Sequence, residues 1–576
     1  MRAAVVSAVV AAVCSGAAVA QPAGKLPLAP PPQSPASAAQ VDAVFSAFDA
    51  TTPGCAVGVG KNGNVLFAKG YGMADLEHHV PISAKTMFYM ASVSKQFTAL
   101  TVLTLAKEGR LDLKDSVRKY VPELPAWANK MTVYQLLTHT SGVRDYFTLG
   151  QLSGLPGETV YTDDLVLRIL GRQQGPNFDP GTQFLYSNSG YVLLSIIVKR
   201  VTGKPLNDVA RGVVFGPLGM TATLFQHDHS GLIDNKAYGY DRRNGTWHAS
   251  NSMLDVVGDG GLYSSVDDMM RWMSNFDAPK VGADSLSVME EPGKLGDGKP
   301  IAYGMGLAPG MYRGLKVIDH SGGLAGYRTE DMWFPTERLA VVVLCNSGAA
   351  NPTQLGQRVA DLYLKDAPLP APASPATATQ IDNKPEVAVD PKLLDAYVGD
   401  YELRPGFVIS FVRDGDHLVT QATGQAAFPM YAVSNTAFRL RLIAAEVDFD
   451  GPEDGGKAQS AVLHQNGAVA ALKRVVIVRP SAEQLKTYEG RFYSPELDVT
   501  YEVANRDGRL QVRFPGGELV LNPMGKDVFA GPGGSTATFS CVGGGPCSGF
   551  SLDDGRALKL RFTRVASAAP GAKQGS

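Results

Sequence analysis

The sequence has few cysteines, almost no net charge, and no long apolar run beyond its first residues. Its 53 Lys and Arg residues nearly balance 55 Asp and Glu residues, for a formal net charge of -2. This charge gives no electrostatic basis for binding nucleic acid or an anionic membrane surface. A transmembrane helix needs roughly 20 consecutive apolar residues, and no segment approaches that length. We therefore expect neither a nucleic-acid partner nor a membrane span.

The five cysteines show no zinc-like spacing. Cys541 and Cys547 bracket a loop short enough for one local disulfide. Cys55 and Cys345 each lie in a strand-like apolar run, which favours two small buried residues. The pair His227-x-His229 lacks further ligands at usable spacing. We expect no metal and no cofactor.

The N-terminus has the features of a secretory signal. Met1-Arg2 precedes the apolar run Ala3–Val13, and Ala18-Val19-Ala20 forms a small-residue cleavage site, which predicts a signal peptide over residues 1–20. Residues 21–39 are rich in Pro, Ala and Ser, which predicts a disordered leader. We therefore expect an exported protein, periplasmic or secreted.

A chain of 576 residues is too long for one hydrophobic core. Residues 366–390 are Pro- and Ala-rich and predict a linker. Beyond them Tyr397-Val398-Gly399-Asp400-Tyr401 recurs as Tyr488-Glu489-Gly490-Arg491-Phe492 among short alternating strands, which indicates two small antiparallel barrels. The predicted domains are 40–365, 391–478 and 481–566, with a disordered tail at 567–576.

The span Phe88–Gly109 is apolar on nearly every face, which predicts a buried central helix ended by Gly109. Ser92 and Lys95 are three residues apart, so their side chains would share one helix face. Burial disfavours the ammonium form, so such a lysine can act as the base that a serine nucleophile needs. The second Ser-x-x-Lys, Ser116 to Lys119, lies in a polar stretch and is expected to be a solvated helix start.

Two further motifs lie on other predicted elements. Tyr186-x-Asn188 precedes a helix, on a loop of the kind that often carries catalytic side chains. His320-Ser321-Gly322-Gly323 lies on the first of three successive strands, which suggest an antiparallel sheet. His139 is a lone histidine and is expected to be structural. His229-Ser230-Gly231 has no strand pair behind it and is not expected to form a site.

The three motifs, in this order, resemble the serine β-lactamase and penicillin-binding-protein family. The resemblance covers about residues 40–365 and points to the branch of class C β-lactamases, D,D-carboxypeptidases and D-aminopeptidases. It implies an α/β catalytic domain, in which helices flank an antiparallel sheet and a second part is all-helical. The two β-barrels that follow resemble those of the D-aminopeptidases.

The resemblance implies a two-step acyl-enzyme reaction. Ser92 would be the nucleophile, and Lys95 and Tyr186 would share the general-base work. The backbone N–H groups of Ser92 and Gly323 would form the oxyanion hole. Donors aimed at a developing oxyanion are worth a few kcal/mol in acyl transfer.

The implied substrate-binding residues are Asn188, His320, Ser321 and Gly322. Class C β-lactamases have Lys-Thr-Gly where this chain has His320-Ser321-Gly322, and a histidine is only partly charged at neutral pH. We therefore expect a serine peptidase or amidase acting on peptides that contain D-amino acids. A carboxylesterase or weak β-lactamase, and a non-catalytic sensor that binds penicillin or peptidoglycan, remain alternatives. The absence of Gly-x-Ser-x-Gly argues against an α/β-hydrolase.

Overall fold

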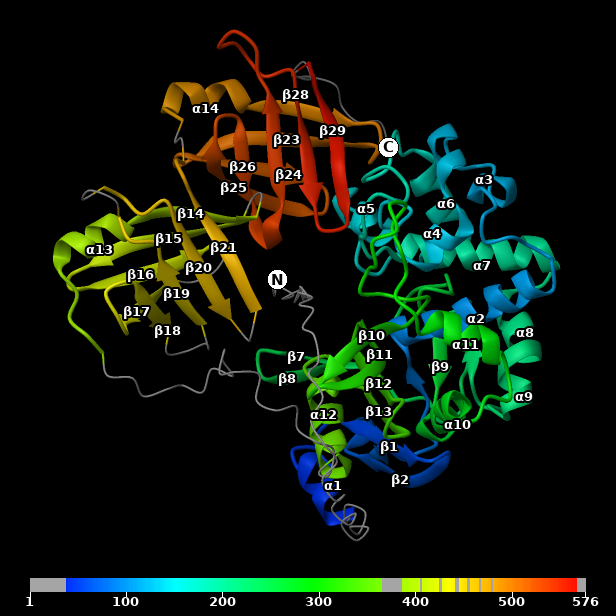
Figure 1. Ribbon diagram of the computed structural model, residues 1–576. Helices are drawn as coiled ribbons and strands as arrows, with labels where there is room; N and C mark the ends of the chain where they lie inside the picture. The colour runs from blue at the N-terminus through cyan, green and yellow to red at the C-terminus, as the bar shows by residue number, and fades with distance from the viewer. Residues whose placement is uncertain are drawn as a thin grey trace, which may run out of the picture. The chain divides into compact units, whose positions relative to one another are not determined.

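The computed structural model describes residues 38–364, 386–404, 407–423, 427–440, 445–452, 456–465, 468–477 and 480–566. The chain divides into two compact units, the first with nearly all of residues 38–364 and the second with the residues from 386 onward. Figure 1 shows the elements of each unit. The predicted signal peptide, nearly all of the leader, most of the linker and the tail lie outside the described residues.

The first unit is built on a six-stranded antiparallel sheet, as predicted. Asn62 and Gly63 both have positive φ and form the tight turn between its first two strands. The apolar strands that come first and last along the chain pair with each other in the interior of the sheet. In spatial order the strands are β10 (Ala308–Tyr312), β11 (Leu315–Leu324), β12 (Tyr327–Phe334), β13 (Leu339–Cys345), β1 (Cys55–Lys61) and β2 (Asn64–Tyr71).

Helices pack on this sheet. Helix α10 (Val266–Asp277) contacts β1 and β13, and the Ser265 side chain caps its N-terminus. Helix α12 (Pro352–Tyr363) contacts β12 and β13, and α1 (Ala38–Val44) packs on α12. The core between α12, α1 and the sheet consists largely of aliphatic side chains.

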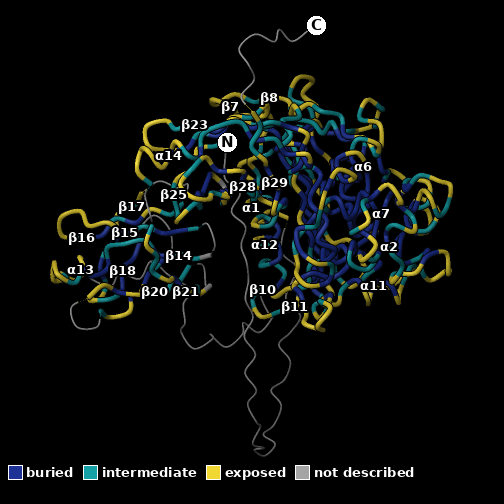
Figure 2. Tube along the Cα trace, turned by 90° about the horizontal axis from the view of Figure 1, so that it is seen from above, coloured by how far each residue is buried: buried dark blue, intermediate teal, exposed yellow. Residues whose placement is uncertain are grey.

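The remaining helices form the predicted all-helical part. Its main members are α2 (Ser94–Lys107), α4 (Val133–Leu137), α6 (Asp163–Gly171) and α7 (Asn188–Thr202). Helix α2 contacts α7, and Figure 2 shows both helices within the mostly buried interior. Among the helices that the structure describes, none is both long and apolar enough to cross a membrane.

The central helix is buried as predicted, but it is shorter. Phe88–Tyr89 forms strand β5, and Ala91–Val93 forms a 3-10 turn before α2. Ala91 has a φ of 47°, which an α-helix does not accommodate. The Met90 N–H instead donates to the carbonyl of Leu262, so strand pairing displaces the first turns of the predicted helix.

The prediction that Cys55 and Cys345 are only small buried residues is wrong, because they form a disulfide. The two residues face each other directly in the antiparallel register of β1 and β13, with their Cα atoms 4.0 Å apart. Both side chains are fully buried. The bond therefore joins the first and last strands of the sheet, which are 290 residues apart in the chain.

The second unit contains two closed antiparallel barrels, as predicted. Each has eight strands, preceded by a short helix, α13 (Pro391–Tyr397) or α14 (Ala482–Tyr488). The first barrel runs from β14 (Gly399–Arg404) to β21 (Ala468–Val475). The second runs from β22 (Gly490–Ser494) to β29 (Ala557–Val565).

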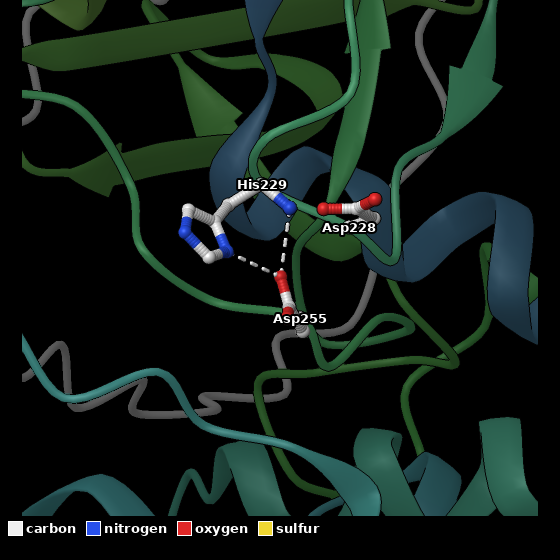
Figure 3. Close-up of side chains that lie close together, drawn as sticks. All are labelled: Asp228, His229 and Asp255. Atoms are coloured by element: carbon white, nitrogen blue, oxygen red, sulfur yellow. Dashed lines mark hydrogen bonds and ion pairs between the residues drawn. The ribbon is translucent and has the colours of Figure 1, made fainter.

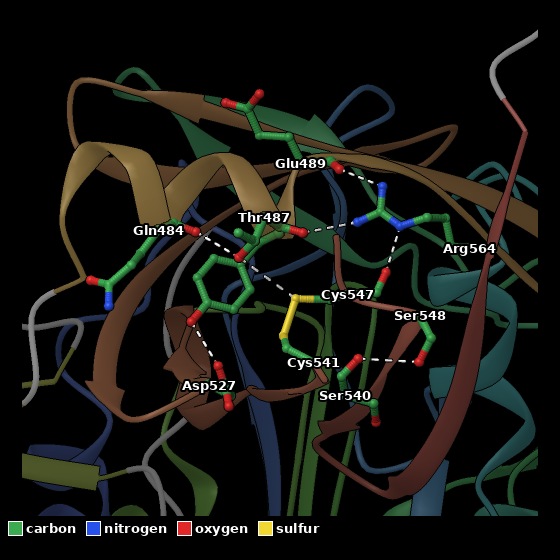
Figure 4. Close-up of a disulfide and its surroundings, with 10 residues drawn as sticks. Gln484, Thr487, Glu489, Asp527, Ser540, Cys541, Cys547, Ser548 and Arg564 are labelled. Carbon is green, nitrogen blue, oxygen red and sulfur yellow. Dashed lines mark hydrogen bonds between the residues drawn. A yellow bond between two sulfur atoms is a disulfide. The ribbon is translucent and has the colours of Figure 1, made fainter. Parts of the chain in front are cut away.

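The recurring segments of the two barrels both contain a glycine, Gly399 or Gly490. In each barrel an arginine of the last strand leaves no room for a larger residue there. Arg474 lies over Gly399, and Arg564 lies over Gly490, where an added Cβ would meet the guanidinium at 2.4 and 2.2 Å. In Figure 4 the Arg564 guanidinium donates to carbonyls at the end of α14 and to the carbonyl of Cys547. The local disulfide between Cys541 and Cys547 is present beside it.

Candidate active site

The structure brings Ser92 and Lys95 into contact. Ser92 lies on the 3-10 turn, and Lys95 lies in the first turn of α2. The Lys95 Nζ donates to the Ser92 Oγ at 3.1 Å, to the Asn188 Oδ1 at 3.0 Å and to the Asp259 carbonyl at 2.7 Å. Lys95 has no exposed surface, whereas Ser92 is half-buried. The hydroxyl of a half-buried serine thus lies against a fully enclosed amine.

Tyr186 and Asn188 lie beside this pair, at the N-terminal end of α7. The Lys95 Nζ is 4.9 Å from the centroid of the Tyr186 ring. Asn188 is the first residue of α7, and its backbone N–H donates to the Asp145 Oδ2 at 2.7 Å. A carboxylate at a helix N-terminus is favourable because the first N–H groups have no partner within the helix. Asp145 therefore anchors Asn188, a role that the sequence analysis did not identify.

The loop Gly258–Gly261 supplies the third acceptor of Lys95. The Thr98 Oγ1 donates to the Gly258 carbonyl at 2.9 Å, which ties the loop to α2. Asp259 is buried, its Oδ2 accepts from the Tyr146 hydroxyl, and burial raises the pKa of its carboxyl to about 6. Gly258 and Gly261 have positive φ. A cluster of glycines around one acidic residue is the signal that would have pointed to this loop.

Strand β11 lies against the turn that carries Ser92. The Thr329 Oγ1 on β12 donates to the Met90 carbonyl at 2.9 Å. A Cβ added to Gly322 would lie 2.4 Å from the same carbonyl, so only glycine allows this approach. Gly322 is buried, while Ser321 and Gly323 are exposed. Gly322 thus packs against the turn that carries Ser92, while Ser321 and Gly323 on either side of it are open to solvent.

His320 is a neutral part of this wall. Its Nδ1 lies 2.7 Å from the Ser321 carbonyl, which can only accept, so Nδ1 carries the proton. Its Nε2, 3.0 Å from the Tyr303 hydroxyl, then accepts. Burial, and then the nearby charge of Lys95, lowers the pKa of His320 to about 4. His320 therefore supplies no positive charge at neutral pH, and Tyr303 is a site neighbour that the sequence analysis missed.

Asp331 on β12 lies opposite His320 and is predicted to make stability depend on pH. Burial raises the pKa of its carboxyl to about 7, above the roughly 3.9 of an unfolded chain. The folded state then binds more protons between these values, so the free energy of unfolding falls as pH rises through this range. Asp331→Asn keeps an acceptor for Gln96 and removes the charge. We expect it to raise the Tm at pH 8 more than at pH 5.

The Tm of wild type and variant would be measured by calorimetry at several pH values. Asp179 is exposed, so Asp179→Asn is the matched control and should follow the wild-type pH dependence. Equal shifts for Asp331→Asn at pH 5 and pH 8 would contradict the assignment.

A second cluster consists of Asp228, His229 and Asp255. Asp255 approaches His229, whose Nδ1 lies 2.8 Å from the Asp255 Oδ1, and Asp228 lies nearby (Figure 3). The Asp228 Oδ1 accepts from the backbone and the hydroxyl of Ser230. These contacts account for the cluster as local loop structure, and Asp255 is a partner that sequence spacing did not show.

The chain is similar to known proteins over the residues that hold this site. The family model described as Beta-lactamase matches residues 41–364. The D-aminopeptidase of Gluconobacter oxydans is 32% identical over 59% of this chain and 64% of its own length. The D-aminopeptidase of Cereibacter sphaeroides is 28% identical over 85% of this chain and 90% of its own.

A solved structure extends the likeness in fold. The octameric penicillin-binding protein homologue from Pyrococcus abyssi has a TM-score of 0.51 and 22% identity to this chain. The match covers 82% of this chain and 96% of the homologue. The family model covers more than half of the chain and includes Ser92, Lys95, Tyr186, Asn188 and His320. The chain therefore belongs to the beta-lactamase family.

Proposed function

We propose that the protein is a serine hydrolase that cleaves amide bonds next to D-amino acids through a covalent acyl-enzyme. The observation that carries the proposal is the enclosed Lys95 amine, which contacts both the Ser92 hydroxyl and the Asn188 amide. Acyl transfer needs a nucleophile, a base within hydrogen-bond reach and donors for the oxyanion. The D-aminopeptidase relatives support the choice of substrate.

In the proposed reaction the Ser92 Oγ attacks the substrate carbonyl, and its single proton passes to the Lys95 and Tyr186 pair, in which one of the two groups has given up a proton. The backbone N–H groups of Ser92 and Gly323 stabilise the resulting oxyanion. The carbon–nitrogen bond then breaks, and the amine leaves with that proton. Water attacks the acyl-serine in the second half of the reaction, with Tyr186 as base, and releases the acid and the free hydroxyl.

The neutral His320 favours an uncharged substrate group at the third motif. Its Nδ1–H donates to the Ser321 carbonyl, and its Nε2 accepts from the Tyr303 hydroxyl. His320 therefore cannot hold a substrate carboxylate by charge, as the lysine of Lys-Thr-Gly can in class C β-lactamases. We infer that amides of D-amino acids are better substrates than β-lactams or peptides with a free D-alanyl carboxylate. Short carboxylesters form a second substrate class because the acyl-enzyme step is the same.

A substrate panel tests this proposal. The purified protein would be assayed with D-alanine amide, L-alanine amide, D-alanyl-D-alanine peptides, a chromogenic cephalosporin and short-chain esters. We expect kcat/KM for D-alanine amide to exceed that for its L-enantiomer and for the cephalosporin by about tenfold or more, a difference of about 1.4 kcal/mol. A cephalosporin as the best substrate would contradict it. Binding without turnover beyond one equivalent would instead indicate a sensor.

We also propose that the protein is exported. The predicted signal at residues 1–20 supports export, as do the two disulfides, because disulfides persist in oxidising compartments. Fractionation of expressing cells should recover a shortened chain outside the cytoplasm. A full-length cytoplasmic protein with reduced thiols would exclude this.

A further inference from the structure

His139 lies two residues beyond the end of α4 and has an unusual backbone. Its φ is 57°, in the left-handed region that only a few per cent of non-glycine residues adopt. The side chain is 2% exposed. A lone histidine is expected to be structural, but several contacts of His139 involve residues that carry or surround Tyr186.

His139 binds the backbone on both sides of Tyr186. Its carbonyl accepts the N–H of Leu185 at 3.0 Å, and its Nδ1 accepts the N–H of Ser187 at 3.2 Å. Because a backbone N–H can only donate, Nδ1 must be unprotonated. The imidazole therefore has a fixed tautomer, with its proton on Nε2.

The imidazole also packs on the Tyr186 ring itself. The two ring centroids are 4.1 Å apart with an angle of 33° between the planes. On its other sides the imidazole contacts the rings of Tyr191 at 5.2 Å and Tyr303 at 4.7 Å. One residue thus holds the backbone before Tyr186, the backbone after it and the face of its ring.

We propose that His139 is a positioning residue that fixes the Tyr186 phenol relative to Lys95 and Ser92. The inference rests on the proposed function, since it assumes that Tyr186 moves the proton during acylation. A displacement of a catalytic group by about 1 Å can cost about 100-fold in rate. Losing the contacts of His139 should therefore slow acylation and leave substrate binding nearly unchanged.

Four substitutions separate the contacts. His139→Asn places an amide oxygen close to the position of Nδ1, and asparagine tolerates a positive φ. His139→Gln carries its oxygen one bond farther, near the position of Nε2. His139→Phe keeps the ring stacking without an acceptor, and His139→Ala removes both. We expect kcat to fall by about 10- to 100-fold for Phe, Gln and Ala, and by about threefold or less for Asn.

The readouts are the rate of Ser92 labelling by a fluorophosphonate and the kcat and KM for 4-nitrophenyl acetate. His229→Phe is the matched control, because His229 also uses its Nδ1 but contacts Asp255 instead. It should retain the wild-type labelling rate. The Tm of each variant shows whether it is folded.

The inference is overturned if His139→Phe labels at the wild-type rate, or if His139→Asn is no faster than His139→Gln. The second comparison remains decisive even if the Phe and Ala variants fail to fold. A wild-type protein that is not labelled at Ser92 would instead refute the proposed function. The two failures are therefore distinguishable.

Discussion

Ser92→Ala is expected to abolish turnover of every substrate that the protein accepts. Without the hydroxyl no acyl-enzyme forms, and the Lys95 amine loses one of its three acceptors. Removing the nucleophile of a serine hydrolase lowers kcat by about 10⁴-fold or more. The base and the oxyanion donors remain, but no group is left to attack the substrate carbonyl. The measurement is kcat with the best substrate of the panel, together with labelling by a fluorophosphonate.

The chain offers a matched control in its second Ser-x-x-Lys. Ser116 is the N-cap of a short helix, α3 (Val117–Tyr120), and Lys119 pairs with Asp115 at the surface. Lys119 is exposed, as expected for a solvated helix start, whereas the Ser116 Oγ is buried and makes no capping hydrogen bond. Ser116→Ala should therefore keep full activity and labelling. Equal losses in both variants, or labelling retained in Ser92→Ala, would refute the role of Ser92.

Replacing both Cys55 and Cys345 by alanine is expected to destabilise the first unit strongly. The bond closes a loop of 290 residues, for which the chain-entropy model gives a stabilisation of about 5–6 kcal/mol. The two cysteines are also fully buried, so alanine leaves small voids next to β1 and β13. We expect a lower midpoint of denaturant unfolding, measured by fluorescence on the oxidised protein.

The second disulfide serves as the control. Cys541 and Cys547 are only six residues apart, and the same model gives about 2 kcal/mol for so short a loop. Their removal should leave the unfolding of the first unit unchanged. If the Cys55 and Cys345 variant unfolds at the wild-type midpoint, or if both thiols of the unfolded wild type react before reduction, the assigned pairing is wrong.

Features that depend on neighbours in the chain were predicted well. The three-residue spacing of Ser92 and Lys95 places both side chains together even though Ser92 lies on a 3-10 turn instead of the helix. Local motifs of the same kind are the capping box of Thr132 and Gln135 and the left-handed Gly203 after α7. These signals are local because each is set by a few backbone N–H and C=O groups.

Several contacts between residues that are distant in the chain were not predicted. The Cys55 and Cys345 bond follows from strand register, which sequence alone does not supply across 290 residues. His139 contacts a loop 48 residues away. Asp259 accepts from Lys95 through its backbone carbonyl, a group that every residue type carries. Site neighbours of this kind become visible only when the fold brings their elements together.

The central claim is that substrate becomes covalently attached to Ser92, and acid-quenched mass spectrometry tests it most directly. The protein would be mixed with a slowly turned-over ester, quenched within one turnover, and digested for peptide mapping. We predict one adduct, with the mass of the acyl group, on the peptide that contains Ser92. Turnover with a pre-steady-state burst but no adduct, or an adduct on any other residue, would contradict the account.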